Sequence, residues 1–276
     1  MQKMKIKQKR YLQMKTPKRV AVKVGSNVLT RADGRLDIAR MASLVDQIAD
    51  LHKRGIEVML ISSGAVASGR GALPHLKNDD SVTGRQLFAA VGQAKLIEHY
   101  YNFFQEYDIT VGQILTTKEN FVDQTLQLNQ KRCMGAMLKN RIVPVINEND
   151  TVSVKELMFT DNDELSGLVA QMMKAELLVI LSNVDGVFTG NPEDPESELI
   201  RTVQAEEDYS QCVSNSKSKY GRGGMMTKMK TAKSVAKNGI EVRIANGTRQ
   251  NILLDVVLNP ETAVCTRFLT PKNRKK

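Results

Sequence analysis

The sequence predicts an α/β fold, a three-layer α/β/α sandwich with a mainly parallel central sheet. Short runs of apolar residues recur along the chain, and stretches with helical periodicity separate them. The connections are short, which favours parallel strands joined by helices that cover both faces of one sheet. Several runs end in small or polar residues, as do strands whose carboxyl ends line a ligand-binding crevice.

The net charge of +10 on the 276 residues is concentrated at the two ends of the chain. Residues 1–19 contain eight basic residues and no acidic one, and the last five residues contain four more basic ones. The remaining 28 basic and 30 acidic residues make the body nearly neutral. We therefore expect a basic, disordered N-terminal extension (1–18), one domain (19–270) and a basic tail (271–276), with the tails solvated rather than bound to nucleic acid.

The composition also bears on location and metal binding. No apolar run approaches the ~18 residues that a membrane span requires, and no signal-peptide core is visible. Cys133, Cys212 and Cys265 form no pairing pattern, and no His/Cys cluster has zinc spacing. We therefore expect a reduced, cytoplasmic protein with no metal ligands of its own and no membrane partner.

The first half of the chain predicts strands at 19–25, 57–61 and 110–115, with helices at 36–53 and 84–107 between them. The first helix should end at Gly55, a typical C′ glycine. The apolar face of the second should consist of Leu87, Ala90, Val91, Ala94 and Ile97. A further helix, over about 121–139, leads into the fourth strand.

The fourth strand is the centre of the prediction. Ile142-Val143-Pro144-Val145-Ile146 is typical of a strand buried on both faces, and Asn147-Glu148-Asn149-Asp150 follows without a break. In open α/β sheets, ligands bind just past the carboxyl ends of strands, where these polar residues would lie. An ordinary turn rich in Asn and Asp is the alternative.

The second half predicts a half-exposed hairpin at 151–159, a helix at 162–175 and a strand at 177–181. Asp185-Gly186 could turn a small hairpin, and 191–197 should be a loop. A helix at 225–237 should close at Asn238-Gly239, and strands near 241–244, 252–257 and 263–268 should complete the sheet.

Four loops and two helix starts are expected to meet in one crevice: 24–27, 62–65, 147–150, 182–189, Asp161 and Gly223-Gly224. Glycine-lined turns and helix N-termini present backbone N–H groups to phosphate oxygens, while Lys23 and Lys228 add positive charge. A solvent-facing Lys23 and a glycine-rich linker at 221–224 are the alternatives. Neither the Walker A nor the Rossmann pattern is present.

The residue types in this crevice suit phosphoryl transfer without a covalent intermediate, since they include two lysines but no candidate nucleophile. Asp161 and Glu164 could form a capping box, yet a carboxylate at Asp161 could also orient the lysines. Asn149 and Asp150 would suit an ammonium group of the acceptor, and Ser63 a carboxylate. Mg²⁺ would accompany the phosphates of ATP.

Six motifs occur in order between residues 19 and 268: Val22-Lys23-Val24-Gly25-Ser26, Ser62-Ser63-Gly64-Ala65-Val66-Ala67-Ser68-Gly69-Arg70, Ala89-Ala90-Val91-Gly92-Gln93, Asn147-Glu148-Asn149-Asp150, Asp161-Asn162-Asp163-Glu164-Leu165-Ser166 and Gly223-Gly224-Met225-Met226-Thr227-Lys228. The set resembles the amino acid kinase superfamily and, within it, the glutamate 5-kinase family. The second and fourth motifs are specific to that branch.

The resemblance implies transfer of the γ-phosphoryl group of ATP to the side-chain carboxylate of glutamate, which gives glutamyl 5-phosphate, the first intermediate of proline synthesis. By position, Lys23 and Lys228 would stabilise the transferring group and Asp161 would orient them. Glutamate would be bound by Ser63, Gly64, Asn147, Asn149, Asp150 and Asn162. ATP would be bound by Lys23, Gly25, Ser182, Asn183, Arg222, Gly223, Gly224, Met225, Met226, Thr227 and Lys228.

The chain also departs from the family pattern. Ser182-Asn183 stands where many bacterial members have Thr-Asp, and Arg222 replaces a small hydroxyl residue. Many members carry a C-terminal PUA domain, which we do not expect here. The resemblance further implies a homo-oligomer (a dimer or a tetramer), coupling to glutamyl 5-phosphate reductase and, in many members, inhibition by proline.

Two alternatives remain open at this point. One is a sister kinase of the same fold that acts on N-acetylglutamate, aspartate, carbamate or a nucleotide. The other is a non-catalytic protein that binds nucleotides or RNA through its basic tails.

Overall fold

The computed structural model describes residues 16–76, 81–153, 162–204 and 224–271. These residues form one eight-stranded sheet in the order β3-β4-β2-β1-β5-β7-β8-β6. The named strands pair in parallel, except β7 with β8, so the mainly parallel sheet is confirmed. The strands are β1 (Arg19–Val24), β2 (Glu57–Ser62), β3 (Val111–Thr116), β4 (Val143–Glu148), β5 (Leu177–Ser182), β6 (Thr202–Gln204), β7 (Glu241–Asn246) and β8 (Cys265–Leu269).

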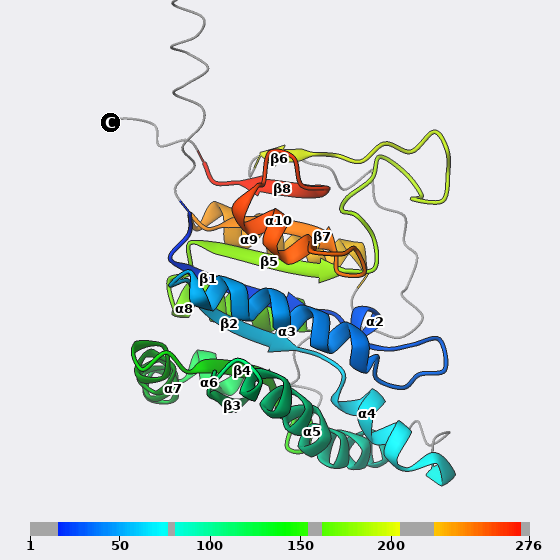
Figure 1. The fold of residues 1–276 in the computed structure, drawn as a ribbon, viewed down its shortest axis with the longest axis vertical. Coiled ribbons are helices and arrows are strands. Elements are labelled where there is room, and N and C mark those ends of the chain that lie inside the picture. Colours follow the sequence, from blue (N-terminus) through cyan, green and yellow to red (C-terminus); the bar gives the residue numbers. More distant parts are fainter. Residues whose placement is uncertain (1–15, 77–80, 154–161, 205–223, 272–276) are drawn as a thin grey trace, which may run out of the picture.

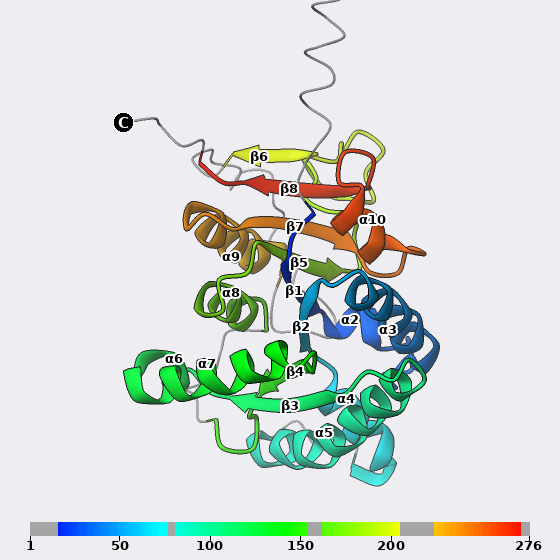
Figure 2. The same cartoon turned by 60° about the vertical axis from the view of Figure 1, so that its left-hand side comes forward.

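Helices cover both faces of this sheet (Figures 1 and 2), which confirms the three-layer prediction. One face is covered by α3 (Ile38–Lys53), α5 (Val82–Gln105) and α10 (Ile252–Leu258). The other face is covered by α7 (Gln124–Lys139), α8 (Asn162–Met172) and α9 (Met225–Lys237). Shorter elements lie between these: α2 (Ser26–Leu29), α4 (Ala65–Ala72), η1 (Pro74–Leu76) and α6 (Glu119–Val122).

Strand β1 lies in the interior of the sheet, between β2 and β5. Because successive strand residues point to opposite faces, Val20, Val22 and Val24 pack against one helical layer. Ala21 belongs to the core on the other face, the side of α8 and α9. Lys23 follows Ala21 by two positions, so the alternation of the strand places a lysine in this buried layer.

Helix α5 buries a different face from the one predicted. Its buried residues recur mostly every four positions: Gly84, Phe88, Ala89, Gly92, Leu96, Tyr100 and Phe104. Leu87 is 41 % exposed, and Ala90 and Ala94 are also exposed. The prediction is wrong because it followed the aliphatic residues, whereas the helix packs through large aromatic rings and through glycines.

Helix α4 is absent from the sequence prediction, since a short segment with two glycines has a low helix propensity. The structure explains these glycines by contact with α5. A Cβ atom on Gly69 would lie 1.9 Å from the carbonyl oxygen of Phe88, and one on Gly92 would lie 1.8 Å from that of Ala65. The two helices therefore touch backbone to backbone, and packing rather than propensity stabilises α4.

Residues 252–257, predicted as a strand, form helix α10 instead. The run Ile-Leu-Leu-Asp-Val-Val is short and apolar, so its pattern does not separate a strand from a buried helix. Its buried residues are Ile252, Leu253, Val256 and Val257, a helical spacing on one face. Packing against α3 and β7, which the sequence does not reveal, therefore favours the helical conformation of this segment.

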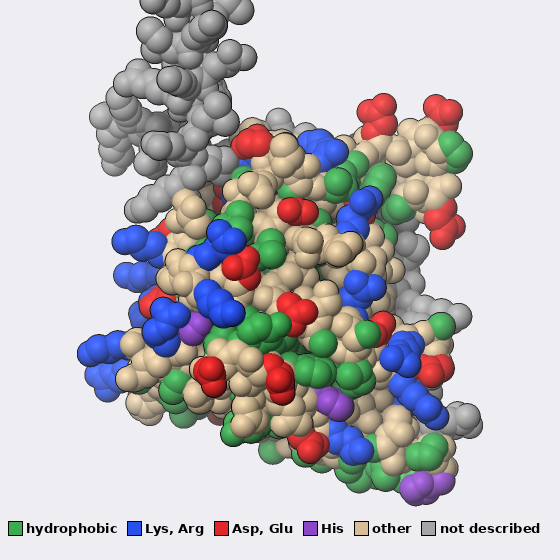
Figure 3. All heavy atoms as spheres, viewed as in Figure 1, with side chains coloured by type: hydrophobic (Ala, Val, Ile, Leu, Met, Phe, Trp, Pro, Cys, Tyr) green, Lys and Arg blue, Asp and Glu red, His purple; other side chains and the backbone are tan. Residues whose placement is uncertain are grey.

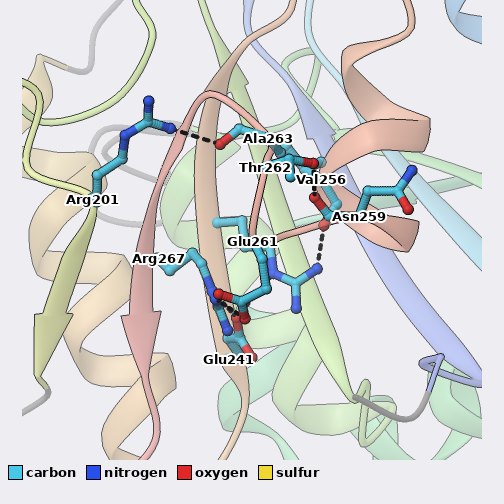
Figure 4. A network of polar contacts seen from close by, with 9 residues as sticks. Arg201, Glu241, Val256, Asn259, Glu261, Thr262, Ala263 and Arg267 are labelled. Carbon is cyan, nitrogen blue, oxygen red and sulfur yellow. Dashed lines mark hydrogen bonds and ion pairs between the residues drawn. The ribbon is translucent and has the colours of Figure 1, made fainter. Parts of the chain in front are cut away.

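A polar network secures the antiparallel pair of β7 and β8 to α10 (Figure 4). Arg243 and Arg267 are direct cross-strand partners, which alone would be repulsive. Glu241 Oε1 accepts hydrogen bonds from both, at 2.9 Å and 3.0 Å. Arg267 also pairs with Glu261 at 2.6 Å, and Arg243 donates to the carbonyl oxygen of Val256 in α10. The Glu241 carboxylate thus offsets the repulsion between the buried Arg243 and the largely buried Arg267.

Other elements differ in detail from the prediction. Strand β4 continues through Asn147 and Glu148, which are buried in the sheet instead of following it. The helix predicted over 121–139 is divided at Asp123, whose side chain caps α7 by accepting from Leu126 N at 2.8 Å. Strand β6 was not predicted. In the predicted hairpin at 151–159, residues 154–159 lie outside the described residues.

Asp185-Gly186 does not make the predicted two-residue hairpin. Asp185 instead pairs with Arg249, in the turn after β7. A Cβ atom on Gly186 would meet Thr266 Oγ1 at 2.4 Å, and the nearby antiparallel bridge joins Phe188 and Leu199. Gly186 therefore serves a close approach to β8 and not a tight turn.

The surface of the described body agrees with its near-neutral composition. Figure 3 shows acidic and basic side chains interspersed over the face in view, without a field of one sign. Among the described residues, no helix is long and apolar enough to cross a membrane. Most of the basic residues of the two tails lie outside the described residues.

The backbone contact between α4 and α5 leads to a test of packing. We expect Gly92→Ala to lower the free energy of unfolding by at least about 1–3 kcal/mol, because its Cβ would overlap a backbone oxygen that cannot rotate away. Gly135→Ala in α7 is the matched control, since its Cβ would meet nothing within 4 Å. That control should gain up to ~1 kcal/mol from helix propensity. Urea unfolding measures both, and an unchanged midpoint for Gly92→Ala would contradict the close contact.

Candidate active site

The centre of the site is a carboxylate held between two lysines. Asp163, in the first turn of α8, has no exposed surface. Its Oδ1 lies 2.7 Å from Lys23 Nζ and its Oδ2 lies 3.0 Å from Lys228 Nζ. Lys23 is 4 % exposed and Lys228 is 9 % exposed, so all three charges are largely removed from water. The solvent-facing alternative for Lys23 is therefore excluded.

The titration of Asp163 reflects this arrangement. Burial by itself would raise the pKa of the Asp163 carboxyl, since desolvation disfavours the charged form. The charges of Lys23 and Lys228 act in the opposite direction, and so do their hydrogen bonds. The net effect lowers the pKa of Asp163 below its ordinary value, and the carboxylate is ionised at neutral pH.

Close packing of α8 on α9 fixes the relative position of these groups. A Cβ atom on Gly167 would lie 3.0 Å from methyl carbons of both Thr231 and Val235. Asp163 lies one turn before Gly167 on α8, and Lys228 lies about one turn before Thr231 on α9. The small residue therefore lets both helices approach closely enough for the ion pair to form.

Asp163, a carboxylate that the sequence analysis did not single out, contacts both lysines. Asp161 lies outside the described residues, so its predicted role stays a prediction. Asp163, two positions further on, was missed because Asp161 fits the N-cap position of a capping box. Glu164, the other member of that predicted box, lies 3.3 Å from Lys118 Nζ. The signal that could have found Asp163 is its spacing of four positions from Gly167, the residue at which α8 packs closely against α9.

Asn162 precedes Asp163 in α8 and joins two of the other predicted loops. Its Nδ2 donates to Ser63 Oγ and to Asn147 Oδ1, both at 3.0 Å. Asn147 in turn donates from Nδ2 to Gln93 Oε1 of α5, at 2.9 Å. The structure thus brings Ser63, Asn147 and Asn162 together, as the sequence predicted, and adds Gln93, which the prediction had placed only within a motif.

The loop after β2 is shaped by backbone and by a buried phenol. Gly64 has φ +109°, a conformation that L side chains rarely adopt, and it caps the start of α4. Tyr100 Oη lies 2.8 Å from Ser62 Oγ, and Ser62 Oγ donates to the Ser63 carbonyl oxygen. Burial raises the pKa of Tyr100 to about 12, so the phenol stays neutral and supports the loop.

The polar residues after β4 are also ordered. Asn149 N donates to the Thr116 carbonyl oxygen at 2.8 Å, and Asn149 Oδ1 accepts from Thr151 Oγ1 at 2.6 Å. Asp150 follows at a half-buried position. These contacts form part of a turn, as the alternative held, but the turn lies beside Asn147 at the end of a buried strand.

The predicted phosphate-binding residues lie around Lys23 and Lys228. Gly25 N donates to the Leu181 carbonyl oxygen at 3.1 Å, and a Cβ on Gly25 would lie 3.5 Å from Lys23 Nζ. Gly224 is the N-cap of α9 and has no side chain to occupy the N–H groups of its first turn. Met225, Met226 and Thr227 form that turn, whereas Arg222 and Gly223 lie outside the described residues.

The loop after β5 is tied to the turn after β7. Ser182 is buried, its carbonyl oxygen accepts from Gly247 N at 2.8 Å, and Asn183 next to it is exposed. Arg249 binds both carboxylate oxygens of Asp185, at 2.6 Å and 2.5 Å. The hydrogen bonds from Arg249 hold the pKa of Asp185 below its ordinary value. This clamp was missed because Asp185 fitted a hairpin turn.

The donor set of the site suits phosphate rather than a resident metal. Within the described residues, no group of three His, Cys, Asp or Glu side chains could hold a metal ion. The two ammonium groups and the glycine-rich turns instead offer donors to anionic oxygens.

Comparisons with known proteins agree with this geometry. The family model described as the amino acid kinase family matches residues 18–246. A glutamate 5-kinase of Bacteroides thetaiotaomicron is 59 % identical over 251 residues, which cover 91 % of this chain and 70 % of that protein. A glutamate 5-kinase of Clostridium tetani is 40 % identical, with 92 % of this chain and 95 % of that protein covered.

The fold is similar to a solved structure as well. The crystal structure of UMP kinase from Ureaplasma parvum matches with a TM-score of 0.64 and covers 92 % of this chain and 99 % of that one. At 14 % sequence identity, this likeness shows the fold alone.

The buried carboxylate leads to a test of stability against pH. We expect Asp163→Asn to lower the free energy of unfolding at pH 7 by about 3–5 kcal/mol, because two buried ammonium groups lose their counter-charge. Since the pKa of Asp163 is lowered on folding, its contribution is complete above the unfolded-state pKa of about 3.9 and disappears as the pH falls through the folded-state pKa.

Urea unfolding from pH 7 to pH 3.5 should therefore show a gap between wild type and Asp163→Asn that is constant to about pH 4 and then narrows. Asp50→Asn is the control, because its pair with Arg54 is a surface pair on α3. That control should change stability by less than ~1 kcal/mol. An Asp163→Asn protein as stable as the control would refute the structural role of the carboxylate.

Proposed function

The chain belongs to the amino acid kinase family, and we propose that, as a glutamate 5-kinase, it transfers the γ-phosphoryl group of ATP to the side-chain carboxylate of glutamate. The reaction gives glutamyl 5-phosphate and is the first step of proline biosynthesis. The observation that carries the proposal is the buried Lys23–Asp163–Lys228 arrangement beside the polar ends of β2 and β4. Two relatives named glutamate 5-kinase, of whose length the match covers 70 % and 95 %, support the choice of acceptor.

The two lysines are assigned to the transferring phosphoryl group. In a loose transition state the transferring group spreads its negative charge over three oxygens while further charge develops on the leaving oxygen of ADP, and a fixed ammonium group on each side stabilises that charge. Asp163 touches both lysines and is proposed to hold their ammonium groups in position. The orienting role predicted for Asp161 remains a prediction beside it, because Asp161 lies outside the described residues. No covalent intermediate is required, because the acceptor carboxylate is itself the nucleophile.

The acceptor site is proposed at Ser63, Gly64, Asn147, Asn149, Asp150 and Asn162. The β2–α4 turn offers the Ser63 hydroxyl and the Gly64 N–H to a carboxylate, since the Ser63 N–H already donates to the Val24 carbonyl oxygen. Asp150 offers a negative charge to the α-ammonium group of glutamate. Asn162, next to Asp163 in α8, links this region to the lysines.

The nucleotide is proposed to bind along Gly25, Ser182, Asn183 and the first turn of α9, with Arg222 and Gly223 preceding that turn. The N-terminus of α9 carries a partial positive charge that favours phosphate. We propose that Mg²⁺ enters with ATP and is coordinated by its phosphate oxygens. Bound Mg²⁺ would neutralise charge on the phosphates. The side chains of the protein would position the acceptor.

The assignment of the acceptor is tested by ATP- and Mg²⁺-dependent formation of acyl phosphate, trapped with hydroxylamine. We expect product with free glutamate and none with N-acetylglutamate, aspartate or carbamate, because the acceptor site is proposed to fit an unblocked amino acid with a side-chain carboxylate. Product with one of the other acceptors alone would keep the fold and overturn the substrate. ATP binding without product from any acceptor would contradict the kinase proposal itself.

The role of Lys228 is tested by Lys228→Met, which keeps the length of the side chain and removes its charge. We expect kcat to fall by about 10²–10³, as for other groups that stabilise charge in the transition state, with little change in the KM for glutamate. Lys230→Met, at an exposed position on the same helix, should retain full activity. A Lys228→Met enzyme with unchanged kcat would remove this lysine from the catalytic machinery.

We further propose that the chain forms a homo-oligomer through the exposed face of α5. Leu87, Ala90, Ala94 and Tyr101 lie on that face at helical spacing, and Leu87 and Tyr101 are 41 % and 54 % exposed. Exposed apolar side chains gathered on one helix are typical of an interface. We also propose a cytoplasmic location and transfer of the acyl phosphate to glutamyl 5-phosphate reductase.

The proposed interface is tested by Ala94→Arg, which places a charge at the centre of the exposed face of α5. We expect the mass measured by light scattering to fall to that of a monomer, since a buried unpaired charge opposes association. Ser234→Arg, at an exposed position of α9 in the other layer, should leave the mass unchanged. A wild-type protein that is already monomeric would overturn the proposal.

A further inference from the structure

Three side-chain amides form a chain that runs from helix α5 into the acceptor site. Gln93 of α5 lies beside Asn147 of β4, with Gln93 Oε1 2.9 Å from Asn147 Nδ2. Asn147 lies beside Asn162 of α8, with Asn147 Oδ1 3.0 Å from Asn162 Nδ2. Asn147 is 3 % exposed, so water does not readily replace either contact. These three amides connect the helical layer that contains α5 with the layer that contains α8, across strand β4 of the sheet.

The direction of these hydrogen bonds is fixed by one backbone group. The N–H of Glu148 can only donate, and it donates to Asn147 Oδ1 at 2.9 Å. The oxygen of the Asn147 amide must therefore face Glu148 and Asn162, and its nitrogen must face Gln93. It follows that Gln93 presents its oxygen and that Asn162 presents its nitrogen to Asn147. Any other orientation would place two donors or two acceptors against each other.

This direction determines what Asn162 can offer to a ligand. The two protons on Nδ2 are directed to Asn147 Oδ1 and Ser63 Oγ, with the Ser62 carbonyl oxygen at 3.4 Å. The other atom, Asn162 Oδ1, is buried and has no hydrogen-bond partner within the described part of the chain. Buried polar atoms are normally satisfied, so this oxygen calls for a donor. Asn162 lies directly before Asp163, which contacts the two lysines.

We propose that Gln93 is a positioning residue for the acceptor and that, through Asn147, it holds Asn162 Oδ1 ready to accept a hydrogen bond from the α-ammonium group of glutamate. The inference deepens the proposed function and rests on it for the identity of the acceptor. Gln93 itself touches no substrate. If its oxygen is removed, the buried Nδ2 of Asn147 loses its acceptor, and the Asn147 amide can hold its orientation only at the expense of an unsatisfied donor.

The proposal predicts an effect on one chemical group of the ligand and not on the others. Glutarate has both carboxylates of glutamate but no ammonium group, so it makes no use of Asn162 Oδ1. Gln93→Met keeps the size of the side chain and removes the accepting oxygen. We expect the variant to bind glutamate about tenfold more weakly and to bind glutarate as wild type does. Damage to the general shape of the site would instead weaken both ligands.

The experiment is titration calorimetry of glutamate and of glutarate into the full chain with Mg²⁺ and a non-hydrolysable ATP analogue. Calorimetry does not depend on turnover, so the acceptor panel tests the proposed function separately. Gln93→Glu, which keeps an accepting oxygen, should restore the preference for glutamate. Gln105→Met is the matched control, because Gln105 is exposed at the end of the same helix. Gln93→Ala gives the same comparison if the methionine variant does not fold.

Each outcome decides the proposal. A selective loss of glutamate binding in Gln93→Met or Gln93→Ala, with recovery in Gln93→Glu, supports it. Equal weakening of glutamate and glutarate, or no change in either, overturns it. A wild-type protein that binds both ligands equally also overturns it, because the ammonium group would then find no partner that matters. If the wild type binds glutarate but no glutamate, both the inference and the proposed function fail.

Discussion

The ion pair of Asp163 with Lys23 and Lys228 is the constraint on which the site depends. Three charges are taken out of water, and the attraction between them has to offset that cost. The three groups together carry one more positive charge than negative, which suits an anionic phosphoryl group. The buried excess of positive charge costs free energy when the site is empty. Binding of an anionic group would offset that cost. The packing of β1, α8 and α9 holds these three charges together.

The arrangement begins with the interior position of β1. Alternation along that strand directs Lys23 into a layer otherwise filled with aliphatic residues, and Gly167 lets α8 and α9 approach closely enough to supply Asp163 and Lys228. On the other face, Gly92 lets α5 pack directly against α4, the helix that follows the loop after β2. Close approach of helices at glycine residues thus occurs on both sides of the sheet, against side-chain methyl groups at Gly167 and against backbone at Gly92. Large side chains fill the remaining space but do not set these distances.

Much of this could be predicted from the sequence, for reasons that particular residues make clear. A strand predicted at 142–146, observed at 143–148, and the helix at 225–237 were found because each has a strong local pattern. Helix α10 and the buried face of α5 were mistaken, since the first depends on a tertiary register and the second on glycine and aromatic positions. Asp163 was missed because two aspartates share one motif, and the contact of Asp163 with Lys228 of α9 depends on helix packing that the motif does not show. Local pattern identifies elements, whereas contacts between distant elements select the residues that act.

Asn162 and Asp163 bring these contacts together in the first turn of α8. Asp163 is held by two lysines from β1 and α9, and Asn162 by amides and hydroxyls from β4 and β2. Consecutive residues on a helix differ by about 100° in direction. Asn162 and Asp163 can therefore contact two different groups of neighbours from the same turn. A shift of α8 would displace both groups at once. In the proposed reaction, this single rigid element would therefore control the distance between the acceptor carboxylate and the phosphoryl group, as direct transfer between two substrates requires.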